Sequence, residues 1–454
     1  MLPNTSSYTY LKKPSPASQS NSTSSNASVA TIVSNVIDDV RARGDAAVRA
    51  YSQKFDKWDP PTGYKLSAAQ IEAAIAACPA QLIDDIKTVQ GNVRKFAQAQ
   101  RDSLRDFEIE TQPGVRLGQK NVPVESVGAY VIGGRYPLLA SAHMTILTAR
   151  VAGVKNVVGA TPPIAGEVPS ATVAAMHLAG ADEICLLGGV QAIAAMAIGT
   201  ETIKKVDFLA GPGNAFVAEA KRQLFGSVGI ELFAGPTEIL IVADDTASPH
   251  TVAVDILSQA EHGPDSPAVI ITTSEAVGRR AVQLIDELLA NLPTAELAGA
   301  SWRDWGECVA VPTLDDAWRL ADRYASEHVQ ILTKNPREAL DKMRNYGALF
   351  LGEMTCVSYG DKVIGTNHVL PTRGAARCTG GLWVGKYLKT VTYQEVVDPR
   401  ASGELGRLCG RAARAERFEG HARSGDLRAQ KYLGDEYAWI KQSEAKAEKQ
   451  SNGV

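Results

Sequence analysis

From residue 122 onward, short apolar runs that end in Gly or Pro alternate with stretches of helical periodicity. A first series of predicted strands comprises Ser126–Ile132, Asn156–Ala160, Glu183–Leu187 and Val206–Ala210. A second series comprises Glu238–Ala243, Ala268–Thr272, Cys308–Val311, Val329–Leu332 and Ala348–Leu351. Strands that alternate with helices form βαβ units and parallel sheets. The pattern predicts an α/β fold with two doubly wound, Rossmann-like parallel-sheet domains, and the two series suggest repeats of one architecture.

The two ends of the chain have other patterns. Residues 1–28 are rich in Ser, Asn, Thr and Pro and cannot build a core, so we expect a disordered leader. An amphipathic helix is predicted from Thr31 to about Gly44, with more helix as far as about Arg105. After about Pro399 the pattern is helical and highly charged. The predicted parts are residues 1–28, 29–121, 122–236, 237–390 and 391–454: a leader, an N-terminal helical part, two Rossmann-like domains and a helical tail.

Composition and charge exclude two classes of partner. The 454 residues are 45% hydrophobic and 21% charged, which is ordinary for a globular protein. Lys plus Arg number 47 and Asp plus Glu number 50, so the net charge of −3 gives no electrostatic footprint for nucleic acid or an anionic membrane. No run approaches the roughly 18–20 apolar residues of a membrane span. We therefore expect neither nucleic acid nor a membrane as a partner.

The cysteines and the N-terminal residues favour a cytoplasmic protein. The 6 cysteines include no CxxC pair, which indicates reduced thiols rather than a disulfide framework or a thiolate zinc site. The first 28 residues lack the continuous apolar core of a secretory signal, and they also lack arginine, which argues against mitochondrial import. We expect the chain to be cytoplasmic.

Glycine-rich turns follow several strands of the first series, and in open α/β sheets ligands bind beyond the carboxyl ends of the strands. Further along the chain, Ser248 and Pro249 suit the start of a helix that ends at Gly263. Gln259 and His262 are three residues apart and share a face near the end of this helix. An imidazole and an amide oxygen are a plausible half of a metal site. A histidine that merely stabilises a helix C-terminus is an equally good interpretation.

Glu327 and His328 lie where a predicted helix passes into the strand Val329–Leu332. A carboxylate beside an imidazole suits acid–base chemistry. Adjacent residues on a strand point to opposite faces, so both side chains can serve one site only if the junction bends. The motif alone is also consistent with a helix end that has no catalytic role.

Two further polar patterns lie closer to the C-terminus. Asp361, Asn367 and His368 fall within a glycine-rich loop bounded by apolar residues, and loops on rigid scaffolds often carry function. The alternative is an Asp/Asn turn with a capping histidine. His421 lies in a charged helical segment, where a lone histidine is usually solvated surface.

Longer stretches are more specific than any of these motifs. The chain contains, in order, VGAYVIGGRYPL, GGVQAIAAMAIGTET, VDFLAGPGNAFVAEAKRQLF, AGPTEILIVAD, SQAEHGPDS, SEHV, YGALFLGE and GTNHVLPT. In these stretches it resembles the histidinol dehydrogenases, from about Arg41 to Tyr432. The resemblance implies an NAD-dependent homodimer with one zinc ion in each site. It also implies that a small primary alcohol is oxidised through an aldehyde to a carboxylate, with two NAD consumed.

The resemblance implies roles for individual residues as well. The zinc ligands would be Gln259, His262, Asp361 and, from the other subunit, His421. Glu327 and His328 would be the acid–base pair, and the NAD contacts would be Tyr130, Gln191 and Asn214. The substrate would meet the zinc ligands and His328 together with Thr237, His368 and Glu416.

The implied roles form a consistent chemical scheme. Zinc would supply Lewis acidity toward the alcohol, and His328 would take the hydroxyl proton while NAD would accept the hydride. Glu327 would then activate the water that hydrates the aldehyde. The chain lacks a GxGxxG motif, but the turn at residues 211–214 can still offer backbone amides to a cofactor phosphate.

Three positions around the expected substrate depart from the family pattern. The family usually has Ser in place of Thr237 and an aromatic residue in place of Lys362, and it often has Gly or Tyr in place of Arg373. Two added cations near the metal favour a substrate with an anionic tail. The chain also resembles the branch of the family that oxidises sulfopropanediol. If both cations instead point into solvent, L-histidinol stays the alternative substrate.

A relative that kept the fold and bound a nucleotide or metal without catalysis is the alternative from another class. The intact Glu327–His328 pair and the four intact ligand positions argue against it. The formation of NADH from small alcohols in the presence of zinc would separate an enzyme from such a binding protein.

Overall fold

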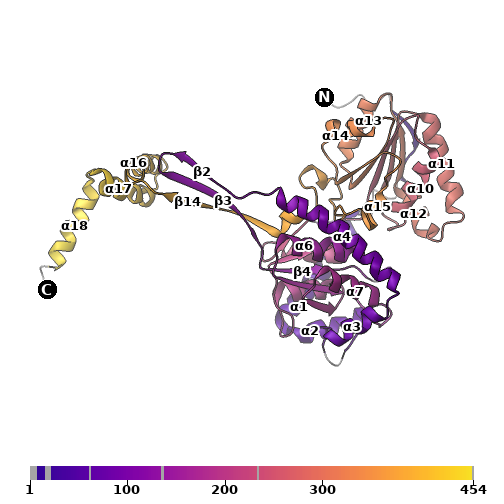
Figure 1. The fold of residues 1–454 in the computed structure, drawn as a ribbon, viewed down its shortest axis with the longest axis horizontal. Coiled ribbons are helices and arrows are strands. Elements are labelled where there is room, and N and C mark those ends of the chain that lie inside the picture. The colour runs from indigo at the N-terminus through magenta and orange to yellow at the C-terminus, as the bar shows by residue number, and fades with distance from the viewer. Residues whose placement is uncertain (1–7, 16–21, 61–62, 134–136, 233–234, 452–454) are drawn as a thin grey trace. The chain divides into compact units, whose positions relative to one another are not determined.

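The computed structural model describes residues 8–15, 22–60, 63–133, 137–232 and 235–451. The chain divides into two compact units, of which the larger holds both parallel sheets (Figure 1). The larger unit comprises residues 1–102 and 123–388, and the smaller unit comprises residues 103–122 and 389–454.

The first parallel sheet confirms the first series of predicted strands. Its strands are β4 (Ser126–Tyr130), β5 (Asn156–Thr161), β6 (Glu183–Leu186), β7 (Phe208–Ala210) and β8 (Gly229–Ile230). They are parallel and lie in the order β6-β5-β4-β7-β8. The sequence pattern misses β8, because a strand of 2 residues is too short to show an alternation.

The second sheet repeats this arrangement and confirms the second series. Its strands are β9 (Ile239–Ala243), β10 (Ala268–Thr272), β11 (Gly306–Ala310), β12 (His328–Leu332) and β13 (Ala348–Leu351). The order is β11-β10-β9-β12-β13, again all parallel, with β1 added at the β11 edge. Among the five parallel strands of each sheet, the first along the chain is central, the next two lie on one side of it and the last two on the other. The suggestion of two repeats of one architecture agrees with this order.

Helices cover both faces of each sheet (Figure 1). Around the first sheet they are α1 (Ser22–Arg43), α2 (Asp45–Tyr51), α3 (Ala68–Ala76), α4 (Ala80–Asp102), α5 (Ala140–Ala142), α6 (Thr148–Ala152), α7 (Ser170–Ala179), α8 (Gly189–Ile198) and α9 (Ala215–Leu224). Around the second they are α10 (Pro249–Ala260), α11 (Glu275–Leu289), α12 (Ala295–Trp305), α13 (Leu314–Tyr324), α14 (Ala339–Lys342) and α15 (Val357–Lys362). Short π and 3₁₀ turns occur at η3 (Ser52–Asp56), η4 (His143–Leu147), η5 (Pro336–Glu338), η6 (Ala375–Arg377) and η7 (Val384–Tyr387).

The prediction of a disordered leader is wrong for strand β1 (Thr9–Lys12) and for the start of α1. β1 pairs antiparallel with β11, and Leu11 packs against the apolar core of the second sheet. The ammonium group of Lys12 donates to the carbonyl oxygen of Gly306 at 2.7 Å. The prediction rested on the average composition of 28 residues. Such an average does not reveal that four of these residues pair with a strand elsewhere in the chain. Residues 1–7 and 16–21 of the predicted leader lie outside the described residues.

In its described residues, the smaller unit contains three strands and three helices. The strands β2 (Phe107–Gln112), β3 (Val115–Pro123) and β14 (Leu388–Val396) lie in the order β14-β3-β2. The helices α16 (Pro399–Ala415), α17 (Glu419–Leu433) and α18 (Ala438–Ser451) lie in the predicted helical tail, but the prediction is wrong for residues 391–396, which belong to β14. The prediction that residues 29–121 are helical is wrong at β2 and β3. All side chains of β2 are exposed. Its sequence nevertheless alternates the apolar Phe107 and Ile109 with Glu108 and Glu110, so the prediction overlooked a pattern that is typical of a strand.

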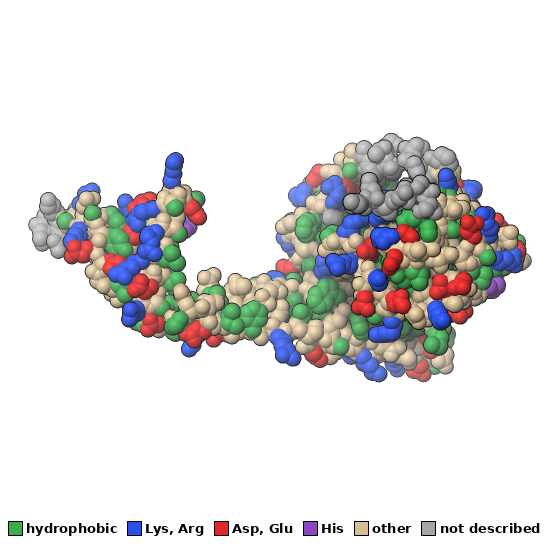
Figure 2. Space-filling model, turned by 90° about the horizontal axis from the view of Figure 1, so that it is seen from above, with side chains coloured by type: hydrophobic (Ala, Val, Ile, Leu, Met, Phe, Trp, Pro, Cys, Tyr) green, Lys and Arg blue, Asp and Glu red, His purple; other side chains and the backbone are tan. Residues whose placement is uncertain are grey.

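Within the described residues, no helix is long and apolar enough to cross a membrane. Figure 2 shows acidic and basic side chains interspersed over the visible face of the larger unit, in line with the nearly balanced charge of the sequence.

Candidate active site

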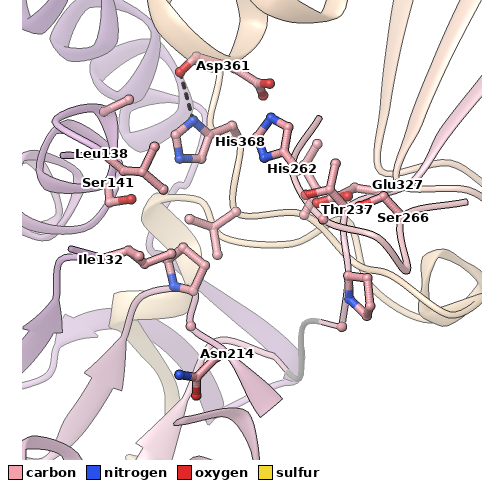
Figure 3. Close-up of a pocket in the computed structure, with 18 of the residues that line it drawn as sticks. Ile132, Leu138, Ser141, Asn214, Thr237, His262, Ser266, Glu327, Asp361 and His368 are labelled. Atoms are coloured by element: carbon pink, nitrogen blue, oxygen red, sulfur yellow. Dashed lines mark hydrogen bonds between the residues drawn. The ribbon is translucent and has the colours of Figure 1, made fainter. Parts of the chain in front are cut away.

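A cavity of about 380 Å³ in the larger unit brings most of the predicted catalytic and metal residues together. The predicted residues that line it are Asn214, Thr237, His262, Glu327, His328, Asp361, Lys362 and His368. Figure 3 shows His262, His368 and Asp361 gathered at one side of this cavity and Asn214 at the opposite side.

The cavity lies at different edges of the two sheets. The first sheet contributes residues that follow its strands, such as Ile132 after β4 and Gly213 after β7. The second sheet contributes residues that precede its strands, such as Thr237 before β9 and Glu327 before β12. The rule that ligands bind beyond the carboxyl ends of strands therefore fits the first sheet and fails for the second. In a βαβ unit the helix runs back against its strands, so the ends of α10 and α13 reach the amino edge of the second sheet.

The junction between α13 and β12 positions Glu327 and His328. Ala325 ends α13 in the left-handed conformation, with φ 52°. The chain therefore bends just before Glu327 and His328, as these adjacent residues require if both are to serve one site. Both side chains are buried and line the cavity. Oε2 of Glu327 lies 3.4 Å from Nδ1 of His328, which places an acid and a base side by side.

The backbone of Glu238 holds this pair. Its N–H donates to Oε2 of Glu327 at 2.9 Å, and its carbonyl oxygen lies 2.9 Å from Nδ1 of His328. Because a carbonyl can only accept, Nδ1 carries the proton and Nε2 is the nitrogen that can act as a base. Nε2 is buried, lacks a hydrogen-bond partner among the described residues and lies 3.5 Å from Oδ1 of Asp361. The sequence analysis missed Glu238, because a contact made through the peptide leaves no mark on the residue type.

Burial and the neighbouring charges have opposing effects on the pKa of Glu327 and on the pKa of His328. Burial raises the pKa of Glu327 to about 8. Burial also disfavours the charged form of His328, but the carboxylates of Glu327 and Asp361 outweigh it and raise the pKa of His328 to about 9. A divalent cation beside Asp361 would offset that carboxylate and lower the pKa of His328 again. The neutral imidazole is the form that works as a general base.

Gln259, His262 and Asp361 supply oxygen and nitrogen donors of the kind that zinc accepts. Gln259 lies in the last turn of α10, His262 follows the end of that helix, and Asp361 lies in α15. Nε2 of Gln259 donates to Oδ2 of Asp361 at 3.0 Å, whereas Oε1 of Gln259 is buried without a hydrogen-bond partner among the described residues. A buried acceptor without a partner is costly, and a cation at this point would satisfy it. The residues present therefore fit a zinc ion.

Two of the predicted site residues, Glu416 and His421, lie in the smaller unit. Glu416 follows α16, His421 lies on α17, and both side chains are exposed. In the described part of the chain, no group of three His, Cys, Asp or Glu side chains could hold a metal ion. The predicted ligand set is compatible with this, since it includes a glutamine and a residue of the smaller unit. The assignment of both residues to the site stays a prediction.

The two added cations line different cavities. Lys362 lines the cavity of about 380 Å³ together with His368, whose Nδ1 lies 2.9 Å from the carbonyl oxygen of Asp361 (Figure 3). Arg373 is absent from the described lining of that cavity and instead lines an adjoining one of about 820 Å³. Its φ of 54° is unusual for a residue other than glycine, and the carboxylate of Glu238 accepts a hydrogen bond from its N–H at 2.6 Å. The expectation that both cations flank the substrate fits Lys362 better than Arg373.

The three predicted NAD contacts lie at the carboxyl edge of the first sheet. Asn214 lines both cavities and caps α9, since its Oδ1 accepts hydrogen bonds from the N–H groups of the second and third residues of that helix at 3.0 and 3.1 Å. Tyr130 and Gln191 are buried, and neither is among the described residues that line the two cavities. The hydroxyl of Tyr130 accepts from the N–H of Gly189 at 3.0 Å, and the amide of Gln191 donates to Asp56 at 3.0 Å.

Residues 19–429 match the family model of histidinol dehydrogenase. The chain belongs to the histidinol dehydrogenase family. A histidinol dehydrogenase homolog from Shouchella clausii is 56% identical over 415 residues, which cover 91% of this chain and 97% of that protein. The sulfopropanediol 3-dehydrogenase of Ruegeria pomeroyi is 45% identical over 434 residues, which cover 94% and 97%. The crystal structure of histidinol dehydrogenase from Elizabethkingia anophelis matches with a TM-score of 0.84 at 34% identity and covers 89% of this chain and 93% of that one.

The resemblance to the histidinol dehydrogenase family seen in the sequence is thereby confirmed. The family is one of dehydrogenases. His328 offers a free ring nitrogen, and Glu327 places a second titratable group beside it.

Proposed function

We propose that this protein is a zinc-dependent, NAD⁺-linked dehydrogenase that oxidises a small primary alcohol through an aldehyde to a carboxylate. The observation that carries the proposal is the free Nε2 of His328 beside Asp361 and the unpartnered amide oxygen of Gln259. This arrangement combines a base for the hydroxyl proton with donors for a Lewis-acidic cation.

The residues divide the work as follows. Gln259, His262 and Asp361 would hold zinc together with His421 of the partner subunit, and zinc would supply Lewis acidity toward the alcohol oxygen. NAD, on the side of Asn214, would supply the hydride acceptor. His328 takes the hydroxyl proton at Nε2. Glu327 takes a proton from the water that adds to the aldehyde, so that a hydrate is available for the second oxidation.

We infer that the substrate carries an anionic tail. Lys362 lines the reaction cavity next to Asp361, and its exposed side chain makes no ion pair or hydrogen bond among the described residues. A sulfonate or carboxylate on the substrate would give this cation a partner. The 45% identity to a sulfopropanediol 3-dehydrogenase supports the same class of substrate. L-histidinol is the second candidate, since relatives named for that activity share the family.

A substrate panel tests the proposal. The purified protein, supplied with zinc and NAD, would be assayed for NADH formation with sulfopropanediol, L-histidinol and a neutral alcohol. We expect the highest kcat/KM with the sulfonate. Efficient oxidation of L-histidinol alone would mean that L-histidinol is the substrate and that the anionic-tail proposal is wrong. No oxidation of any alcohol would favour a binding protein that has lost catalysis.

Substitution of Lys362 should change substrate choice without changing the chemistry. We expect Lys362→Ala to raise KM for the sulfonate about tenfold, the effect of losing one charge-assisted hydrogen bond, and to leave KM for a neutral alcohol unchanged. Arg373→Gly is the matched control, because it removes a cation from the adjoining cavity and also relieves a positive φ. A larger effect of Arg373→Gly than of Lys362→Ala would contradict this assignment.

We also propose a homodimer, in the cytoplasm, whose smaller units complete the sites. In the smaller unit many large apolar side chains are exposed: Phe107, Ile109, Val391, Tyr393, Val396, Val397, Leu408, Phe418, Leu427 and Tyr432. Burial of such a surface against a second copy would be favourable. All six cysteines are free, as in proteins of a reducing compartment.

Subunit exchange tests the shared site. Chains with His262→Ala and chains with His421→Ala should each be inactive alone, but their mixture should regain activity after exchange. In a mixed dimer, one site then holds a native His262 from one chain and a native His421 from the other. If all four ligands came from one chain, neither site of the mixed dimer would be complete, and no activity would return.

A further inference from the structure

An ion pair between Lys221 and Glu231 is buried within the first sheet domain. The two groups are 2.6 Å apart, and their side chains are only 4% and 0% exposed. Lys221 lies on α9 and Glu231 follows β8. Buried ion pairs often contribute less stability than apolar residues of the same volume, so stability alone is a weak explanation for this pair.

The pair makes hydrogen bonds with both backbone polar groups of Gly211. The N–H of Gly211 donates to Oε1 of Glu231 at 2.8 Å, and Nζ of Lys221 donates to the carbonyl oxygen of Gly211 at 2.9 Å. Gly211 has a φ of 128°, and a Cβ atom there would collide with the carbonyl oxygen of Tyr130. The backbone of Gly211 is thus pressed against β4 and fixed there by two charge-assisted hydrogen bonds.

Gly211 begins the turn that leads to Asn214. This turn connects β7 to α9, and Asn214 both caps α9 and lines the reaction cavity. Lys221 lies on the same helix that Asn214 caps, so the ion pair ties together the turn, the helix and the end of β8. A shift of Gly211 would move Asn214 and the adjoining wall of the cavity.

We propose that Lys221 and Glu231 are positioning residues for the cofactor, which act by fixing the turn at residues 211–214. The inference rests on the proposed use of NAD. Oε2 of Glu231 is buried and has no hydrogen-bond partner among the described residues, so Lys221 is the group that balances its charge. The carboxylate and the ammonium group therefore depend on each other, and the turn depends on both.

The double variant Lys221→Met/Glu231→Gln separates positioning from folding. A single substitution would leave one buried charge without a partner and could unfold the chain, whereas the double variant removes both charges and nearly keeps the side-chain volumes. The amide oxygen that replaces the carboxylate of Glu231 can still accept from the N–H of Gly211, but the carbonyl oxygen of Gly211 loses its donor. We expect a folded protein with a modestly lowered melting temperature, because the carbonyl oxygen of Gly211 is left without its donor. We expect an unchanged zinc content and an NADH dissociation constant raised about 10–100-fold, as misplaced contacts cost.

NADH fluorescence titration of the full-length, zinc-loaded protein measures this constant without any alcohol substrate. The matched control is Lys65→Met/Glu183→Gln, which removes an ion pair of the same 2.6 Å length from the surface of the same domain and should leave NADH binding unchanged. Native NADH affinity in the Lys221→Met/Glu231→Gln variant would overturn the positioning role alone. Absence of NADH binding in the native protein would overturn both this role and the proposed cofactor.

Discussion

Replacement of His262 by alanine should leave the protein almost free of zinc. His262, Gln259 and Asp361 are the three proposed ligands in the larger unit, and loss of one ligand weakens a zinc site more than the ~10–100-fold that loss of a supporting contact costs. The remaining amide oxygen, the carboxylate and His421 of the partner subunit would then hold the ion too weakly to survive dialysis. Metal analysis of the dialysed protein measures the result, and activity should fall with the zinc content.

His250→Ala is the control for this experiment. His250 is an exposed residue in the first turn of the same helix, α10, that carries Gln259 near its end. The same substitution there should leave the zinc content at the native level. Full retention of zinc by His262→Ala, or equal loss from both variants, would mean that the ligand assignment is wrong.

The substitution Glu327→Gln should lower turnover by about 10²–10⁴-fold, the usual contribution of a positioned acid or base. Glutamine keeps the shape of the side chain and can still accept the hydrogen bond that the N–H of Glu238 makes to Oε2, 2.9 Å long in the native protein. It cannot take a proton from water, so oxidation of the aldehyde should suffer most. Assays begun from the alcohol and from the aldehyde, with zinc content and NADH binding measured in parallel, separate this loss from a collapsed site.

Glu261→Gln is the matched control for Glu327→Gln. Glu261 lies next to His262, but its carboxylate accepts a hydrogen bond from Oγ1 of Thr294 at 2.8 Å and is not among the described residues that line the cavity. Its substitution should leave turnover nearly native. Comparable losses in both variants would point to a general electrostatic effect and not to a specific base.

The strands of the two parallel sheets could be predicted because their side chains are buried on both faces. Runs such as Ile239–Ala243 are buried at every position, and an uninterrupted apolar run is what such a strand looks like in sequence. The strand Phe107–Gln112 was not predicted, and all of its side chains are exposed. The strand Thr9–Lys12 was missed for another reason. Its partner Gly306–Ala310 lies almost 300 residues further along the chain.

The candidate site shows the same division between side-chain chemistry and backbone geometry. Glu327, His328, Asp361 and His262 are visible in sequence because metal binding and proton transfer demand particular side chains. Glu238 contributes mainly through its peptide group, which every residue type shares. Lys362 and Arg373 line different cavities. Their spacing along the chain does not show this difference.

The opposed edges of the two sheets give the reaction cavity two walls of unlike polarity. At the carboxyl edge of the first sheet, α9 begins at the cavity, so the positive end of its dipole faces inward beside Asn214. At the amino edge of the second sheet, α10 ends at the cavity, so the negative end of its dipole faces inward beside His262. The proposed anionic cofactor and the proposed metal cation would each meet the helix end that attracts it. The cavity would thus accommodate two ligands of opposite charge, although the net charge of the chain is only −3.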